Sequence, residues 1–318
     1  MNPVKITVLM PVYNAAGYIG EAIQSVLKQT LPDFELLIVN DGSTDESVSI
    51  IKQFKDKRIR ILELPRVGIA TALNAGLQEA EGIYIARFDA DDICIPHRLE
   101  KQAAFLDMHP EYVITGSDAE YISEAGEHLF DHLSIAYTHE EIMEQLYVYC
   151  PFIHSSVMYR KDAALKAGGY PPDAHNFEDY LFWIHLSKFG SFNNLPEQLI
   201  KVRLNPASAT IDEKWRGRRF RKLKKNIIYR GYVRKDEGEE LLSIITRQSN
   251  KKLKNGAYYS LCGKKFLVNN YQPAKARTQL TQAMSYYPLR LENYALYILS
   301  FFPRSFINWL HSKSPNRI

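Results

Sequence analysis

Residues 83–92 read IYIARFDADD, an apolar run that ends directly in acidic side chains. Such a run is typical of a buried strand whose carboxyl end meets solvent. Similar runs occur at 5–12, 34–40 and 59–64, and segments with helical spacing of apolar residues separate them, at 20–29, 43–54 and 69–80. Strands that alternate with helices over short connections predict an α/β fold with a mainly parallel sheet flanked by helices.

The pattern of alternation weakens after residue 110. We expect strands at 112–123 and 152–159, helices at 139–147 and 178–188, and helices from about residue 212 onward. Ser43 and Glu46 have the spacing of a capping box, which predicts that a helix starts there and runs to about Phe54. A soft domain boundary is placed near residue 210.

The composition is that of an ordinary globular protein, with 46% hydrophobic and 24% charged residues among 318. Three widely spaced cysteines form no CxxC pair, which predicts no disulfide framework and fits a reducing cytoplasm. The first residues do not resemble a signal peptide, and no uninterrupted apolar run is long enough to predict a membrane span.

Polar residues that follow strands are candidate ligand-binding residues, because ligands of such sheets bind beyond the carboxyl ends of the strands. The acidic group Asp89, Asp91 and Asp92 comes first. Three carboxylates within four residues repel one another, so the group indicates a divalent cation with oxygen ligands, and Mg²⁺ often shares such a site with phosphates. The alternative is an exposed acidic turn that caps the following helix.

Two further acidic groups are candidates for chemistry. Asp41 leaves the strand at 34–40, where its carboxylate can accept a hydrogen bond from a nucleobase N–H; ordinary turn chemistry is the alternative. Glu178 and Asp179 fall in the first turn of the helix predicted at 178–188. A carboxylate there can act as general base on a hydroxyl, although acids placed only for the helix dipole would give the same pattern.

Taken together, these segments resemble the family 2 glycosyltransferases. The segments that carry the resemblance are PVYN at 11–14, NDGSTD at 40–45, RVGIATALNAGL at 66–77, RFDADD at 87–92 and FEDYLFW at 177–183. Each is weak alone, but the set in this order is specific and covers about residues 5 to 205. The resemblance implies a GT-A fold, with residues 1–210 as catalytic domain (nucleotide-sugar binding about 1–110, acceptor part about 111–210) and 211–318 as a basic, helical C-terminal region.

The resemblance also implies roles for single residues. Pro11 and Tyr13 match the segment against the nucleobase, Asp41 matches the residue bonded to the base N–H, and Arg66 lies where the family often contacts the nucleotide. Asp91 matches the direct metal ligand (Mg²⁺ or Mn²⁺), with Asp89 nearer the ribose and phosphates. Asp179 matches the catalytic base, with Glu178 beside it. Asp92 and His154, in PFIHSSVMYR, are weaker candidates, and a hydrogen-bonded core histidine is the alternative for His154.

The implied reaction is an inverting transfer of a hexosyl or N-acetylhexosaminyl group. The donor is a nucleotide-sugar, with UDP favoured through the family, and the acceptor is a hydroxyl of a glycan or lipid-linked glycan. Two rivals remain: a non-catalytic nucleotide-sugar-binding or scaffold protein, and a nucleotidyltransferase of related fold. The latter should carry a Gly-rich basic loop after the first strand, and residues 10–14 do not form one. The GxGxxG and GxxxxGK[ST] motifs are absent.

The C-terminal third suggests an anionic partner. Residues 214–235 hold eleven Lys or Arg and no Asp or Glu, whereas the rest of the chain has a net charge of −7. Residues 294–310, YALYILSFFPRSFINWL, are apolar and aromatic. Together they predict a peripheral protein on the inner face of the plasma membrane. Ordinary surface and packing helices are the alternative, and we expect no nucleic-acid partner because no helix-turn-helix, RNP or zinc signature is present.

Overall fold

The computed structural model describes residues 4–208, 211–248 and 250–312. The chain divides into two compact units. The sheet unit comprises residues 1–120, 132–202 and 222–241, and the helical unit comprises residues 121–131, 203–221 and 242–318. This division differs from the single boundary expected near residue 210. Residues 121–131, at the tip of a hairpin, belong to the helical unit, and residues 222–241, which are helical, belong to the sheet unit.

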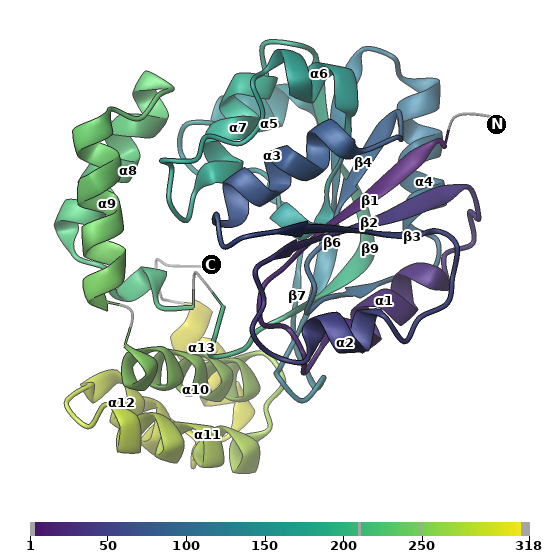
Figure 1. Cartoon of the computed structure of the whole chain (residues 1–318). Helices are drawn as coiled ribbons and strands as arrows, with labels where there is room; N and C mark the ends of the chain where they lie inside the picture. The colour runs from purple at the N-terminus through teal and green to yellow at the C-terminus, as the bar shows by residue number, and fades with distance from the viewer. Residues whose placement is uncertain (1–3, 209–210, 249, 313–318) are drawn as a thin grey trace. The chain divides into compact units, whose positions relative to one another are not determined.

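A mixed, mainly parallel sheet lies at the centre of the sheet unit (Figure 1). Its strands follow the order β3-β2-β1-β4-β8-β6-β9-β5, and β7 pairs with β6. Their bounds are β1 (Ile6–Val12), β2 (Phe34–Asp41), β3 (Ile59–Leu64), β4 (Tyr84–Arg87), β5 (Ile93–Cys94), β6 (Tyr112–Ile122), β7 (His128–His132), β8 (Met158–Arg160) and β9 (Ser191–Arg203).

Helices cover both faces of this sheet, with α3 on one face and α1 and α2 on the other (Figure 1). The helices up to residue 190 are α1 (Ile19–Leu27), α2 (Ser47–Ile51), α3 (Ile69–Glu79), α4 (Arg98–Met108), α5 (His139–Gln145), the 3₁₀ turn η1 (His154–Ser156), α6 (Lys161–Lys166) and α7 (Glu178–Leu186). Close packing of α3 depends on Gly76, because a Cβ at that position would collide with Leu9 of β1 and Val39 of β2.

Parallel pairing brings the carboxyl ends of the first strands to one edge of the sheet. β1 pairs in parallel with β2 along its whole length, from Ile6 opposite Phe34 to Val12 opposite Asn40. Its parallel pairing with β4 ends earlier, at Leu9 opposite Arg87. Proline has no N–H to donate, but Pro11 lies beyond the part of β1 that pairs with β4, so no hydrogen bond between these strands is lost there. Beyond this point β1 and β4 are no longer paired, which is where such sheets bind ligands.

Most elements of the sheet unit agree with the sequence. The strands and helices predicted up to residue 110 are present, except that the capping box at Ser43 is wrong. The Ser43 hydroxyl accepts a hydrogen bond from Asn14 N–H at 3.1 Å instead, and α2 starts only at Ser47 and ends at Ile51. The strand expected at 152–159 is largely wrong, because η1 occupies its middle and β8 starts at Met158.

The helical unit is built from the C-terminal helices and the tip of the β6–β7 hairpin. The remaining helices of the chain are the 3₁₀ turn η2 (Glu213–Trp215), α8 (Arg218–Arg230), α9 (Lys235–Gln248), α10 (Lys251–Val268), α11 (Pro273–Tyr286), α12 (Leu291–Leu299) and α13 (Arg304–Ser312). The unit boundaries fall within α8 and α9. The helices expected from about residue 212 onward are confirmed.

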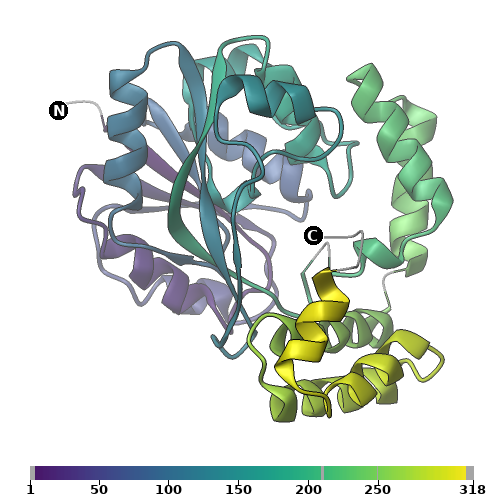
Figure 2. The same ribbon diagram turned by 180° about the vertical axis from the view of Figure 1, so that it is seen from behind.

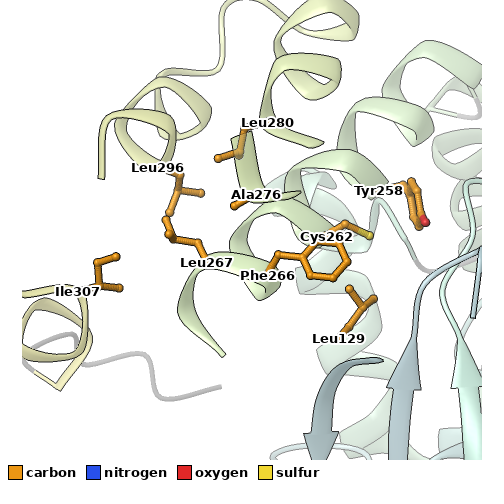
Figure 3. Close-up of a cluster of buried hydrophobic side chains, with 9 residues drawn as sticks. All are labelled: Leu129, Tyr258, Cys262, Phe266, Leu267, Ala276, Leu280, Leu296 and Ile307. Carbon is orange, nitrogen blue, oxygen red and sulfur yellow. The ribbon is translucent and has the colours of Figure 1, made fainter. Parts of the chain in front are cut away.

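The apolar core of the helical unit has Phe266 and Cys262 of α10 at its centre (Figure 3). Leu280 of α11 and Leu296 of α12 belong to it, and Leu129 of β7 contributes to the same cluster. Asn270 donates hydrogen bonds to the backbone carbonyls of residues 128 and 129 at 3.0 and 3.1 Å. These contacts explain why residues 121–131 belong to this unit although they lie between two stretches of the sheet unit.

No helix among the residues that the structure describes is both long enough and apolar enough to span a bilayer.

Candidate active site

Three predicted nucleotide-binding residues form one cluster at the carboxyl ends of β1 and β2. Asp41 is buried at the end of β2, and its carboxylate accepts hydrogen bonds from the N–H groups of Val67, at 2.6 Å, and Gly68, at 3.1 Å. The Arg66 guanidinium forms an ion pair with the same carboxylate. That guanidinium also lies 3.6 Å from the ring centroid of Tyr13, whose side chain is half exposed. The cluster combines an aromatic face with a buried acceptor.

Side-chain hydrogen bonds hold the loops around this cluster together. Asn14, with a positive φ of 51°, accepts a hydrogen bond from Thr44 N–H through its side-chain oxygen at 2.8 Å. Asp45 accepts from Ala16 N–H at 3.0 Å and from the Ser47 hydroxyl at 2.5 Å. Although partial burial opposes this effect, these hydrogen bonds lower the pKa of Asp45. The NDGSTD segment therefore fixes the β1–α1 loop against the start of α2.

Gly42 is needed for the close approach of β2 to the loop that carries Arg66. Its φ is +69°, and a Cβ there would lie 2.8 Å from the backbone nitrogen of Arg66. A side chain at residue 42 would be strained on both counts. This contact lets the backbone of residues 66–68 reach the Asp41 carboxylate.

The acidic group after β4 is organised by a buried arginine. Arg87 is the last residue of β4 and is fully buried, and its guanidinium forms an ion pair with Asp89. Although burial opposes the charged form, the Asp89 carboxylate raises the pKa of Arg87. Asp91 is partly exposed, whereas Asp92 is buried. Asp89 and Asp91 are therefore the members of the group that a ligand can reach.

The first turn of α7 carries the third acidic group. Glu178 is buried, and burial together with the neighbouring Asp179 raises the pKa of Glu178 to about 7. The rings of Trp183 in α7 and His154 in η1 are 5.9 Å apart, and Arg87 N–H of β4 donates to the Val157 carbonyl just after η1 at 3.0 Å, which places α7 near the end of β4. Asp179 is partly exposed, and its carboxylate accepts a hydrogen bond from Tyr180 N–H at 2.7 Å. The structure thus brings the groups from β4 and α7 together.

His154 lies in η1, where its partly exposed ring contacts buried tyrosines. Its Nε2 is 3.2 Å from the hydroxyl of Tyr170, and the hydroxyls of Tyr170 and Tyr159 are also 3.2 Å apart. Burial, followed by the charge of Arg87, lowers the pKa of His154 well below its usual value, so the ring is neutral at physiological pH. Tyr170 is held in turn by Asn74 of α3, through hydrogen bonds of 2.7 and 2.8 Å to its backbone. The position of His154 favours its interpretation as a hydrogen-bonded core histidine.

Sequence reasoning missed Arg87 and Tyr170. Arg87 could have been noticed, since a charged residue inside the apolar run IYIARF must have a partner if it is buried. Tyr170 gave no comparable signal, because its environment is made by Asn74 and His154, which are distant in the chain.

The residues after β4 suit a divalent metal that is held jointly with a nucleotide. In the ranges covered by the structure, no group of three or more His, Cys, Asp and Glu side chains is gathered as a complete metal site. Mg²⁺, however, is commonly held by one or two carboxylates together with substrate phosphates. Asp91, with Asp89 beside it and oriented by Arg87, offers that kind of donor set.

Known proteins resemble the chain in sequence. Residues 7–167 match the family described as Glycosyl transferase family 2. The amylovoran biosynthesis glycosyltransferase AmsE of Erwinia amylovora is 32% identical over 203 residues, which cover 62% of this chain and 75% of that protein. The O-antigen biosynthesis glycosyltransferase WbnJ of Escherichia coli is 32% identical over 212 residues, covering 64% of this chain and 81% of that protein. In an uncharacterised glycosyltransferase of Rickettsia felis, the match spans only 35% of the relative.

Solved structures share the fold. TarS of S. aureus, residues 1–349 in complex with UDP-GlcNAc, is similar with a TM-score of 0.56 at 18% identity, covering 97% of this chain and 92% of that chain. The mannosyltransferase PcManGT of Pyrobaculum calidifontis, in complex with GDP-Man and Mn²⁺, gives a TM-score of 0.54 at 18% identity, covering 99% and 89%. The expected GT-A architecture is confirmed. Because the family match covers half of the sequence, the chain belongs to the family 2 glycosyltransferases.

Proposed function

We propose that the chain transfers a hexosyl or N-acetylhexosaminyl group from a nucleotide-sugar to a hydroxyl, with inversion at the anomeric carbon. The observation that carries the proposal is the convergence of three groups in the sheet unit. The Tyr13–Asp41 cluster ends β1 and β2, the group of Asp89 and Asp91 ends β4, and Asp179 begins α7. These groups suit a nucleobase, a diphosphate and an acceptor hydroxyl, respectively.

The nucleobase binds at Tyr13 and Asp41 in this proposal. A base can stack on the Tyr13 ring, and the Asp41 carboxylate can accept a hydrogen bond from its N–H. Uracil is favoured because the family resemblance points to UDP, and the complex of TarS with UDP-GlcNAc supports this choice. The Arg66 guanidinium now covers both groups, so donor binding requires it to move aside or to stack on the base.

Asp91 and Asp89 hold a divalent cation, Mg²⁺ or Mn²⁺, in this proposal. When bound, the cation would neutralise charge on the departing diphosphate. Arg87 forms an ion pair with the Asp89 carboxylate and so fixes its direction. The complex of the mannosyltransferase PcManGT with GDP-Man and Mn²⁺ supports a metal in this fold.

Asp179 is the general base of the proposed reaction. As the acceptor oxygen forms its bond to the anomeric carbon, the hydroxyl proton passes to the Asp179 carboxylate, and the bond from that carbon to the diphosphate oxygen breaks. The position of Asp179 supports this role, because it is partly exposed in the first turn of α7. Glu178 is the poorer candidate, because it is buried and its raised pKa leaves it partly protonated at pH 7.

The acceptor is a glycan or a lipid-linked glycan in this proposal. The names of AmsE and WbnJ, which refer to amylovoran and O-antigen biosynthesis, support a role in polysaccharide assembly. A chain that works on lipid-linked glycans would act as a peripheral protein at the inner face of the plasma membrane.

Product analysis tests the proposed function. The purified chain is incubated with UDP-sugars and Mn²⁺, and release of UDP is measured with and without added saccharide acceptors. Slow UDP release that requires Asp179 is the expected result. If the chain binds UDP but forms no UDP from any UDP-sugar, it is a binding or scaffold protein. If instead pyrophosphate is formed from UTP and a sugar phosphate, it is a nucleotidyltransferase.

A further inference from the structure

The two units of the chain carry opposite net charge. The residues of the helical unit include 18 Lys or Arg and 6 Asp or Glu, a net charge of +12, whereas the sheet unit has 22 and 30, a net charge of −8. Residues 242–318 alone contain twelve basic residues and one acidic residue, Glu292. The positive charge is thus a property of the helical unit as a whole and extends well beyond residues 214–235. A partner of this unit should be anionic.

Several cations of the 214–235 stretch are used within the protein. Arg216 is buried and lies 3.4 Å from the carboxylate of Asp212. Arg230 and Arg234 both form ion pairs with Glu237. These three residues contribute little to the binding of an external anion. The surface of this protein that binds an anionic partner must therefore include other residues.

Helix α12 is apolar on two opposite faces. Its inner face places Leu296 in the core of the helical unit. On the outer side, Leu291, Tyr294 and Ile298, with Phe301 just beyond the helix, recur at helical spacing and span roughly a quarter turn. Leu291 is 79% exposed, Ile298 is 61% exposed and Phe301 is 66% exposed. A surface helix normally presents polar residues on that side, so this face indicates a binding surface.

Helix α13 continues the apolar surface with aromatic rings. Pro303 separates it from α12, and the ring of Phe306 stacks with Phe302, at a centroid distance of 4.9 Å, and with Trp309, at 5.9 Å. Trp309 is half exposed. Helices α11, α12 and α13 lie together in the helical unit, with α13 in yellow (Figure 2). We call the exposed residues Leu291, Tyr294, Ile298, Phe301, Phe302 and Trp309 the aromatic face.

Cations border the aromatic face. The Arg277 guanidinium of α11 lies 4.7 Å from the ring centroid of Phe301. Arg304, the first residue of α13, is exposed. Aromatic and aliphatic side chains with arginines at their border are the composition of helices that lie in the interface of a lipid bilayer.

We propose that the aromatic face docks onto an anionic phospholipid bilayer. Its side chains enter the boundary between headgroups and acyl chains, and the +12 charge of the helical unit is attracted to the headgroups. A second copy of the chain fits less well, since it would bring two units of +12 together. A nucleic acid would use the charge but not the exposed aliphatic side chains. The proposal identifies the surface by which the proposed transferase reaches a membrane-near acceptor, yet it requires no catalytic step.

Vesicle sedimentation of the full chain tests this proposal. The probes are vesicles of phosphatidylglycerol mixed with phosphatidylcholine, and vesicles of phosphatidylcholine alone. We expect binding to the anionic vesicles that weakens as salt rises from low to high concentration, and little binding to the neutral ones. The double variant Leu291→Ser/Ile298→Ser should bind at least about tenfold more weakly, because it removes two inserted aliphatic side chains.

A matched variant controls for loss of exposed apolar side chains in general. Met108 and Val148 of the sheet unit are 70% and 72% exposed, and Met108→Ser/Val148→Ser should bind vesicles as the unchanged chain does. An unchanged circular dichroism spectrum and an unchanged thermal unfolding curve would show that Leu291→Ser/Ile298→Ser is folded.

Three results would overturn the docking proposal. They are no binding of the unchanged chain to anionic vesicles at low salt, equal binding by both double variants, and a dimer in solution that only Leu291→Ser/Ile298→Ser dissociates. Vesicle binding without UDP binding would instead contradict the proposed function and leave the docking surface supported.

Discussion

The sheet unit buries charged side chains beside its candidate site, whereas the helical unit exposes apolar side chains along one face of α12. In the former, Arg87 is buried against Asp89, and the carboxyl group of Glu178 is buried nearby. In the latter, the core around Phe266 is apolar, and the outer face of α12 is apolar as well. Buried charges cost stability because they lose hydration, and exposed apolar groups keep an unfavourable contact with water that a partner can remove. These are the places where we propose that each unit meets a ligand.

The largest expected effect concerns the chemistry of the sheet unit. Asp179→Asn retains size and hydrogen-bonding atoms but cannot take a proton, so turnover should fall roughly 10²-fold or more. UDP affinity, measured by titration calorimetry, should be nearly unchanged. Glu178→Gln is the matched neighbour. If Glu178→Gln abolishes turnover and Asp179→Asn does not, the two carboxyl groups exchange roles.

Removing core volume should separate the stabilities of the two units. Leu280→Ala leaves a cavity in the helical unit and should cost that unit about 2–5 kcal/mol of unfolding free energy. Leu73→Ala is the equivalent change under the sheet. Urea unfolding monitored by UDP binding should respond strongly to Leu73→Ala and weakly to Leu280→Ala. Equal loss of UDP binding in both variants would show that the units unfold as one.

The buried Glu178 should make stability depend on pH. Its folded-state pKa of about 7 is above its usual value near 4.5, so its stabilising contribution is complete below pH 4.5 and is lost as pH rises through 7. Glu178→Gln remains neutral throughout. With chelator present, this variant should gain up to about 3 kcal/mol relative to the unchanged chain between pH 4.5 and pH 8. A constant difference in urea-unfolding free energy over that range would argue against a raised pKa.

A smaller effect, on the donor KM, is expected from replacing an exposed tyrosine in each unit. Tyr13→Ala removes the stacking surface for the base and should raise the donor KM about tenfold with kcat little changed. Tyr13→Phe should behave like the unchanged chain. Tyr294→Ala, at a similarly exposed tyrosine of the aromatic face, should leave the donor KM unchanged. An equal effect of Tyr13→Ala and Tyr294→Ala would remove the distinction drawn between the two surfaces.

The first half of the fold could be predicted largely because β1, β2 and β4 are buried along their whole length. Runs such as 5–12 and 34–40 contain few polar residues, so their bounds follow from composition. β9 was missed because Ser191–Arg203 contains Asn193, Asn194 and Pro196, which break any regular alternation. The assignment of residues 121–131 to the helical unit was missed too, because it depends on the contact of Leu129 with α10.

The candidate site was predictable where function places polar residues directly after apolar strands. Asp41, Asp89 and Asp91 all meet that condition. Arg66 also follows a strand, but its contacts with both Tyr13 and Asp41 could not be predicted, because they depend on folding of the β3–α3 loop. The capping box failed for a related reason: Ser43 is bonded to Asn14, a partner that helix spacing does not consider.

The central claim is that the sheet unit binds a nucleoside diphosphate together with a divalent cation. Titration calorimetry of UDP into the full chain, with Mn²⁺ or with chelator, tests it most directly. The account predicts binding with Mn²⁺, a large loss of affinity in chelator, and an Asp91→Ala variant that stays folded but binds UDP equally weakly under both conditions. UDP binding that is unchanged by chelator and by Asp91→Ala would contradict it.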